Sequence, residues 1–108
     1  MIDKQSNALV GQAGLLVQEV EGEQVLEVGY HVLPQHRMKG YAIEAARACR
    51  DHAFEQGFAD ALVSIIHTEN VPSMRVAMAN GMRLFRSVDF KGMPVHIFRI
   101  TREEWEQL

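Results

Sequence analysis

Between positions 34 and 42 the chain reads Pro34-Gln35-His36-Arg37-Met38-Lys39-Gly40-Tyr41-Ala42. An apolar run at residues 25–33 precedes this stretch, and an alanine-rich amphipathic run at residues 42–56 follows it. The pattern predicts a basic, glycine-containing turn that joins a strand to the N-terminus of a helix. The first amides of a helix lack partners within it, and the helix dipole adds partial positive charge, so the turn suits an anion such as phosphate. An ordinary connection with two solvated cations is the alternative that these residues leave open.

Length and composition are those of one globular domain, residues 1–108. The chain has 108 residues, of which 47% are hydrophobic and 23% are charged, and a chain of this size can bury a core without staples. The formal net charge of −3 argues against a broad nucleic-acid-binding face. His36, Arg37 and Lys39 nevertheless concentrate positive charge within four positions. This contrast favours a small anionic ligand over a polyanion.

The sequence also carries signals of cellular location. A single cysteine, Cys49, excludes an internal disulfide, which fits a reducing compartment. The polar N-terminus is unlike a signal peptide, and the apolar runs are too short to span a membrane. We therefore expect a soluble, cytoplasmic protein without a membrane partner. The five histidines have no metal-ligand spacing, so no metal is expected.

Hydrophobic periodicity predicts an α/β fold. Apolar, β-prone runs at 9–20 and 25–33 flank a turn at 21–23 and predict an antiparallel hairpin. The helix at 42–56 is followed by a strand at 61–66, apolar enough to be buried on both faces, which predicts a parallel strand–helix–strand crossover. A short helix that opens at 70–73 and ends at Gly81, strands at 84–90 and 95–100 around a turn at 91–94, and a capped turn at 101–105 complete the pattern. The expected sheet is mixed but mostly antiparallel.

Side-chain spacing indicates which helix faces are buried. Small residues recur on one face of the first helix and predict a stripe packed closely on a sheet: Ala42, Ala45, Ala46, Cys49 and Ala53. Arg50 falls mainly outside this stripe, and Arg47 and Asp51 have the spacing of an i,i+4 ion pair. In the second helix Met74, Ala77 and Met78 share a face.

Taken together, the order of elements and four short motifs resemble the GNAT superfamily of acyl-CoA-dependent N-acyltransferases, most of all the branch that acetylates ribosomal-protein N-termini. Residues 37–42 are similar to its pyrophosphate loop, Arg/Gln-x-x-Gly-x-Gly/Ala. Residues 70–76, followed by Gly81-Met82, are similar to its Asn-x-x-Ser…Gly-Phe pattern. Glu27-Val28-Gly29-Tyr30 resembles its Glu-Ile-Gly-Tyr strand, and residues 100–105 resemble a frequent C-terminal end of that branch.

The resemblance implies an acetyl-CoA-dependent N-acetyltransferase that acts on a primary amine without a metal. It implies Glu27 as general base and Ser73 as the residue near the thiol. His31 is a second basic candidate, because alternation along the strand places it on the same face as Glu27. The implied cofactor-binding residues are Arg37, Met38, Lys39, Gly40, Tyr41, Ala42, Asn70 and Ser73. The residues alone leave other roles open, since Glu27 is also compatible with an edge strand facing solvent, and Asn70 and Ser73 with helix capping.

Two departures from the family pattern bear on function. Met38 stands where close relatives usually have glycine. The strand and two helices that precede the hairpin in family members, and form much of the acceptor side, have no counterpart in the sequence. We therefore expect a homodimer, or a partner that covers the shortened side. A non-catalytic CoA-binding or structural module is the alternative function, and a binder of small phosphate ligands is a third.

Overall fold

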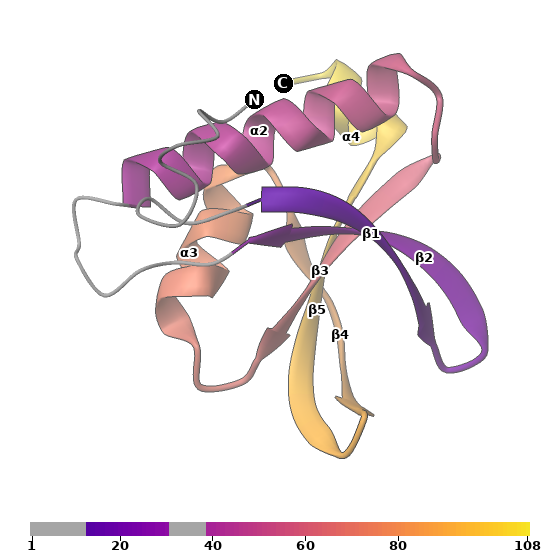
Figure 1. Ribbon diagram of the computed structural model, residues 1–108, viewed down its shortest axis with the longest axis vertical. Coiled ribbons are helices and arrows are strands. Elements are labelled where there is room, and N and C mark those ends of the chain that lie inside the picture. The colour runs from indigo at the N-terminus through magenta and orange to yellow at the C-terminus, as the bar shows by residue number, and fades with distance from the viewer. Residues whose placement is uncertain (1–12, 31–38) are drawn as a thin grey trace.

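The computed structural model describes residues 13–30 and 39–108. Its elements, shown in Figure 1, are β1 (Ala13–Val20), β2 (Glu23–Tyr30), α2 (Lys39–Glu55), β3 (Ala61–His67), α3 (Val71–Ala79), β4 (Arg83–Phe90), β5 (Met93–Thr101) and α4 (Arg102–Glu106). The predicted order of elements is confirmed. Helix α2 begins at Lys39, three residues before the predicted start.

The strands form one five-stranded sheet in the order β1-β2-β3-β5-β4. Strands β1 and β2 are antiparallel, as are β3 and β5, and β4 and β5. Strand β2 runs parallel to β3, with Glu27 opposite Val63, so β2, α2 and β3 make the predicted crossover. The predicted fold class, a mixed and mostly antiparallel sheet, is confirmed.

Two-residue turns close both hairpins. Glu21 and Gly22 have φ angles of 50° and 85°, and Lys91 and Gly92 have φ angles of 52° and 82°. Positive φ at both central residues matches the twist of the flanking strands, and glycine adopts it without a steric penalty. The predicted turn at 91–94 was too long, because the pair Lys91-Gly92 is sufficient and residues 93 and 94 belong to β5.

Helix α2 buries its small-residue stripe as predicted, with Ala42, Ala46 and Ala53 at 5% exposure or less. Arg50 does not fall outside the buried surface, because its side of the helix faces α3. The predicted i,i+4 pair was also wrong, since Arg47 donates a hydrogen bond to a main-chain carbonyl at the end of α3.

Helix α3 is short and ends at a glycine, as predicted. Gly81 has φ of 85°, which reverses the chain direction after the helix. The buried apolar residues of the helix are Val76 and Ala77, with Met74 partly buried against the same core. The prediction that Met78 shares this face was wrong, because Met78 is 54% exposed.

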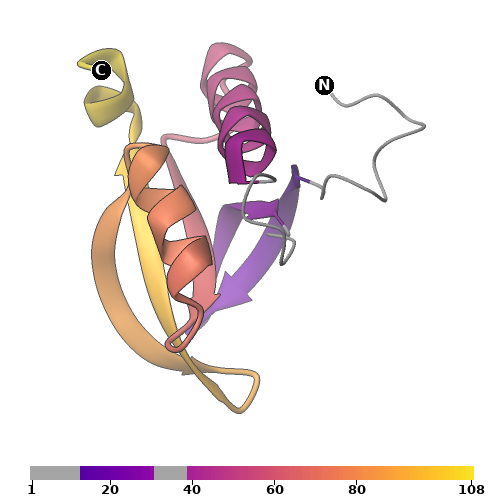
Figure 2. The ribbon, with the colours of Figure 1, turned by 90° about the vertical axis from the view of Figure 1, so that its left-hand side faces the viewer.

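Helices α2 and α3 cover one face of the sheet, and α4 adds Trp105 to the same core (Figures 1 and 2). The opposite face is called here the helix-free face, for the described part of the chain. Its smaller apolar cluster consists of Val20, Val63, Val95 and Ile97. Figure 1 shows these hairpins diverging from β3, away from the helices.

Candidate active site

The parallel ladder between β2 and β3 stops shortly after it starts. Glu27 and Val63 form the one residue pair between these strands within the described residues, although β2 continues to Tyr30 and β3 to His67. Beyond this pair, side chains connect the strands: Ser64 Oγ donates to Val28 O at 2.8 Å. The two strands therefore leave an interruption in the middle of the sheet, which regular parallel pairing would have closed.

Glu27 lies at this interruption. Its Oε2 atom accepts a hydrogen bond from the main-chain N–H of Ile65 at 3.0 Å, and its Oε1 atom accepts one from Gln18 Nε2 at 3.0 Å. The residue is only 8% exposed. A solvent-facing edge position is thus excluded, because β2 is an interior strand. Two donors fix the carboxylate, and each oxygen keeps a lone pair for another proton or donor.

Asn70 and Ser73 stand at the start of α3. The side chain of Asn70 caps the helix by accepting a hydrogen bond from Ser73 N at 3.2 Å. The capping role that the sequence left open for both residues therefore belongs to Asn70. Ser73 lies in the first turn and is 6% exposed. Because β2 and β3 are parallel and α3 follows β3, the first turn of α3 lies at the same end of the sheet as the interruption (Figure 1).

The predicted phosphate loop is described only from Lys39 onward. Arg37, Met38 and His31 lie outside the described residues, so their predicted roles stay predictions. Residues 39–42 form the first turn of α2, and the amides of a first helical turn have no acceptor within the helix. Ala42 is buried at 5% exposure, consistent with the close approach predicted for a small residue.

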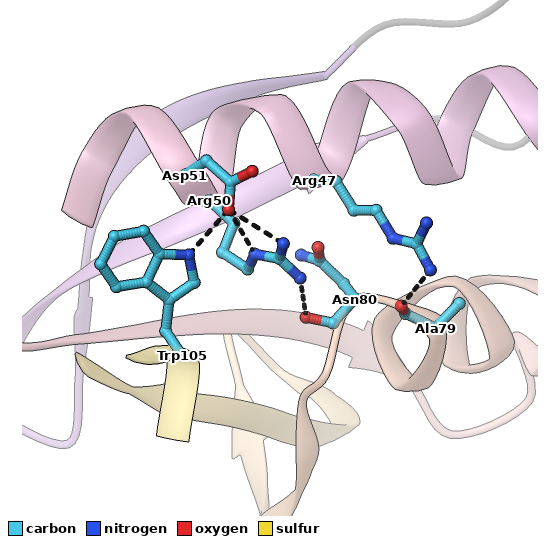
Figure 3. Close-up of polar contacts among 6 residues, drawn as sticks. All are labelled: Arg47, Arg50, Asp51, Ala79, Asn80 and Trp105. Atoms are coloured by element: carbon cyan, nitrogen blue, oxygen red, sulfur yellow. Dashed lines mark hydrogen bonds and ion pairs between the residues drawn. The ribbon is translucent and has the colours of Figure 1, made fainter. Parts of the chain in front are cut away.

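A polar cluster that sequence reasoning missed joins α2 to the C-terminal end of α3 and to α4 (Figure 3). Arg47 Nη2 donates to Ala79 O at 3.1 Å, and Arg50 Nη1 donates to Asn80 O at 3.0 Å. Asp51 accepts hydrogen bonds from Arg50 Nε at 2.9 Å and from Trp105 Nε1 at 2.7 Å. Two α2 arginines thus satisfy carbonyls at the C-terminus of α3, where cations are favoured.

Three other features bear on a functional role: the Cys49 thiol, clusters of metal-ligating side chains and long apolar helices. Burial raises the pKa of the Cys49 thiol, which disfavours its thiolate, and the side chain packs partly buried against the core. No three His, Cys, Asp or Glu side chains are placed to hold a metal ion in the part of the chain that the structure describes. Among the same residues, no helix has the length and apolar character needed to cross a bilayer.

Comparison with known proteins assigns the family. The sequence model of the acetyltransferase (GNAT) domain matches residues 1–83. The chain belongs to this family, as the motifs predicted. It is 33% identical over 90 residues to the uncharacterized N-acetyltransferase YnaD of Bacillus subtilis (strain 168), covering 78% of the chain and 53% of YnaD. The chain spans about half the length of the curated relatives it matches.

Solved structures agree with this assignment. A putative GnaT-family acetyltransferase from Bordetella pertussis superposes with a TM-score of 0.69 at 26% identity, over 82% of the chain and 56% of that protein. The aminoglycoside acetyltransferase AAC(6')-Ib in complex with coenzyme A has a TM-score of 0.69 at 17% identity, over 77% of the chain and 49% of that protein. This second likeness shows a shared fold only.

Proposed function

We propose that this chain is an acetyl-CoA-dependent N-acetyltransferase that acetylates a primary amine, in the cytoplasm and as one domain. The observation that carries the proposal is the Glu27 carboxylate, buried where the pairing of β2 and β3 stops and held by Gln18 and by the amide of Ile65. A general base needs a fixed carboxylate within reach of the amine. The membership of the chain in an acetyltransferase family supports the same reaction.

The residues of the site fit coenzyme A. The first-turn amides at 39–42 suit a pyrophosphate, as helix N-termini commonly do. The interrupted β2–β3 ladder suits an extended arm with amides of its own, because such an arm pairs with main-chain groups as an added strand does. Arg37, Met38, Lys39, Gly40, Tyr41, Ala42, Asn70 and Ser73 remain the residues that we expect to hold it. The coenzyme A complex of AAC(6')-Ib, which shares the fold, supports this choice of ligand.

The charge and acidity of each side chain determine its role in the proposed reaction. When bound, acetyl-CoA supplies a thioester whose C–S bond breaks as the amine nitrogen forms a C–N bond with the acetyl carbon. Glu27 accepts the proton that the amine loses, directly or through a water. Ser73, in the first turn of α3, donates its hydroxyl proton to the departing sulfur and takes a proton from solvent in exchange. Gln18 and Ile65 hold the Glu27 carboxylate in one orientation, which limits the loss of entropy in the transition state.

Ligand-induced thermal stabilisation tests the binding half of the proposal. A ligand at 100 times its Kd stabilises a folded protein by about 2.7 kcal/mol, so acetyl-CoA is expected to raise Tm by several degrees. Gly40→Glu is expected to abolish this shift by placing a side chain and negative charge at the helix start. Ala48→Glu, at an exposed position on the same helix, is the matched control. No stabilisation of the wild-type chain at millimolar acetyl-CoA would contradict the proposal.

A panel of amines tests the transfer half. The second candidate is a CoA-binding module without catalysis, which would hold the cofactor at the same first turn of α2 and the same interrupted ladder. Thermal stabilisation by acetyl-CoA together with acetyl transfer to any amine supports the enzyme, whereas stabilisation without turnover supports the module.

Self-association is proposed on a separate observation. Strand β1 ends the described sheet, and two apolar residues on it, Leu16 and Val17, are 52% and 69% exposed. An exposed apolar edge strand is a common surface for pairing. We expect light scattering to report a dimer, and a monomer at high concentration would contradict this.

A further inference from the structure

One arginine on the helix-free face carries a charge that no neighbour balances. Arg99 on β5 has no hydrogen bond or ion pair among the described residues. Its Cζ atom lies 4.3 Å from the ring centroid of Phe85 on β4, so the guanidinium stacks on the ring. Stacking leaves the edge N–H donors of a guanidinium available. Phe85 therefore holds the Arg99 guanidinium in place, while its N–H donors have no acceptor among the described residues.

The neighbouring arginines are already paired. Arg83 forms an ion pair with Glu104, and Arg86 Nη1 lies 2.7 Å from Glu21 Oε1. The charges within each of these two ion pairs cancel, so Arg99 carries the remaining positive charge among these arginines. One unbalanced guanidinium with a planar fork matches one carboxylate in both charge and shape. The nearby Glu104 disfavours a more highly charged group such as phosphate.

A pocket surrounds this guanidinium. It has a volume of about 300 Å³ and is lined by Arg83, Leu84, Phe85, Arg99, Thr101 and Glu104. Phe85 also lines a second hollow, which includes Val25 and Val63. The β4–β5 register is irregular between Leu84 and Arg86, and this bulge places Phe85 beneath the arginine.

The sheet register relates this pocket to Glu27. Glu27 lies opposite Val63, Val63 lies opposite Arg99, and Arg99 lies opposite Arg83. Residues directly opposite each other on neighbouring strands point to the same face of a sheet. Glu27 and Arg99 therefore share the helix-free face in one row, two strands apart, at a spacing of about 10 Å between their backbones.

We propose that Arg99, supported by Phe85, is an acceptor subsite for a carboxylate, so that the preferred amine carries a carboxylate about 10 Å from its nitrogen. This inference rests on the proposed function for the position of the amine at Glu27. Arg99 binds the carboxylate, and Phe85 positions the guanidinium by stacking. The substrate class is then an amine with a remote acidic group, such as a long ω-amino carboxylic acid or a short peptide with an acidic end.

Matched acceptors test the specificity. The wild-type chain is assayed on a linear ω-amino carboxylic acid that spans about 10 Å, on its carboxamide, and on the amine ending in phosphate. We expect kcat/KM for the carboxylate to exceed that for the carboxamide by roughly ten-fold or more, as for a charge-assisted hydrogen bond, with the phosphate ranking below the carboxylate. Equal values for the carboxylate and carboxamide, or a preference for phosphate, would overturn the inference.

Substitutions of Arg99 and Phe85 test whether these two residues cause the preference for a carboxylate. Arg99→Gln is expected to reduce the carboxylate preference to about one-fold, and Arg99→Lys, which keeps the charge without the planar fork, to an intermediate value. Phe85→Leu tests the stack and is also expected to give an intermediate preference. Arg75→Gln, an equal charge change at an exposed α3 position, should leave the preference intact. An unchanged preference in Arg99→Gln would refute the assignment.

A binding experiment without acetyl-CoA separates this inference from the proposed function. In a titration with the amino carboxylic acid, the guanidinium Nε–Hε NMR signal that is missing in Arg99→Gln is expected to shift in the wild-type chain. The carboxamide should not shift it. If no amine is acetylated but this shift occurs, the proposed function fails and the carboxylate subsite stands. If amines are acetylated and the signal does not respond, the subsite fails and the proposed function stands.

Discussion

The two faces of the sheet use arginine differently. On the helix-covered face, Arg47 and Arg50 donate to main-chain carbonyls at the end of α3, and Arg50 also contacts Asp51. On the helix-free face, Arg99 stacks on Phe85 and has no polar partner among the described residues. The first arrangement satisfies two main-chain carbonyls, of which the Asn80 bond is buried, and holds α2 against α3. The second leaves donors available, which is the property a binding site needs.

The same contrast separates the two glutamates with the most contacts. Glu104 accepts hydrogen bonds from Thr101 N and Thr101 Oγ1, and it also pairs with Arg83, all near the start of α4. Glu27 accepts two hydrogen bonds in the middle of the sheet, one of them from an amide that a regular parallel ladder would have used. A carboxylate at the start of a helix stabilises that helix. A buried carboxylate at an interrupted strand ladder is instead a candidate for binding or catalysis.

The largest expected effect comes from neutralising Glu27. In Glu27→Gln the side chain keeps its size but loses its basicity, so acetyl transfer is expected to fall roughly 100-fold or more. The thermal shift with acetyl-CoA should be unchanged, because the variant removes a base and no predicted cofactor contact. Initial rates at saturating acetyl-CoA and thermal shifts in parallel provide the measurement.

The control for Glu27→Gln is Glu23→Gln, an equal charge change at the exposed first residue of the same strand. This control is expected to retain full activity. Undiminished transfer by Glu27→Gln would assign the base elsewhere and would make Glu27 a purely structural carboxylate, as Glu104 is.

Local features of the fold could be predicted from the sequence. The alanine stripe of α2, the glycine that ends α3 and the Thr101–Glu104 capping box each depend on neighbours within a few positions, and all are confirmed. Arg50 could not be placed, because helical periodicity indicates one buried face, whereas α2 packs against both the sheet and α3. Packing between two helices is not encoded in the period of either one.

Only part of the candidate site could be predicted, because sequence motifs are local and contacts between distant residues are not. The motif around Glu27 is continuous in the sequence, but its contact with Ile65 joins residues 38 positions apart. Phe85 and Arg99 were missed because a β-bulge changes which side chains share a face, and strict alternation along β4 contains no sign of it. Ser64 was a weak signal that sequence reasoning passed over, a polar residue within an apolar strand.

A smaller effect is expected from the helix-covered side, on stability. Arg50→Met removes the hydrogen bond to Asn80 O and the contact with Asp51, and leaves a buried carbonyl without its donor. Hydrogen bonds to charged groups contribute about 1.5–3 kcal/mol, so the free energy of unfolding should fall by about 2 kcal/mol. Urea denaturation followed by circular dichroism measures this loss.

Arg86→Met is the matched control for Arg50→Met. It breaks the ion pair with Glu21, in which both side chains are about half exposed, at 46% and 50%, and exposed pairs are worth less than about 1 kcal/mol. If Arg50→Met and Arg86→Met lowered the free energy of unfolding equally, the buried and the exposed arginine would stabilise the fold to the same extent. The two faces of the sheet would then not differ in this respect.

The smallest effect concerns Glu104, which links α4 to the arginine at the edge of the carboxylate pocket. The hydrogen bond from Thr101 N, and then those of Arg83, lower the pKa of Glu104. A carboxyl group whose pKa is lower in the folded than in the unfolded chain stabilises the fold above its ordinary pKa of about 4.3. That contribution is lost as the pH falls from there through the lowered value. The Tm of the wild-type chain should therefore decrease with acidification over this range.

Glu104→Gln should flatten that decrease, because the variant has no carboxyl group to protonate at this position. Glu103→Gln, at the adjacent and exposed residue, supplies the comparison and should keep the wild-type slope. Thermal melts between about pH 6 and pH 3.5 bracket the ordinary glutamate pKa. If both variants retained the wild-type slope, the Thr101 and Arg83 contacts would not favour the ionised carboxylate.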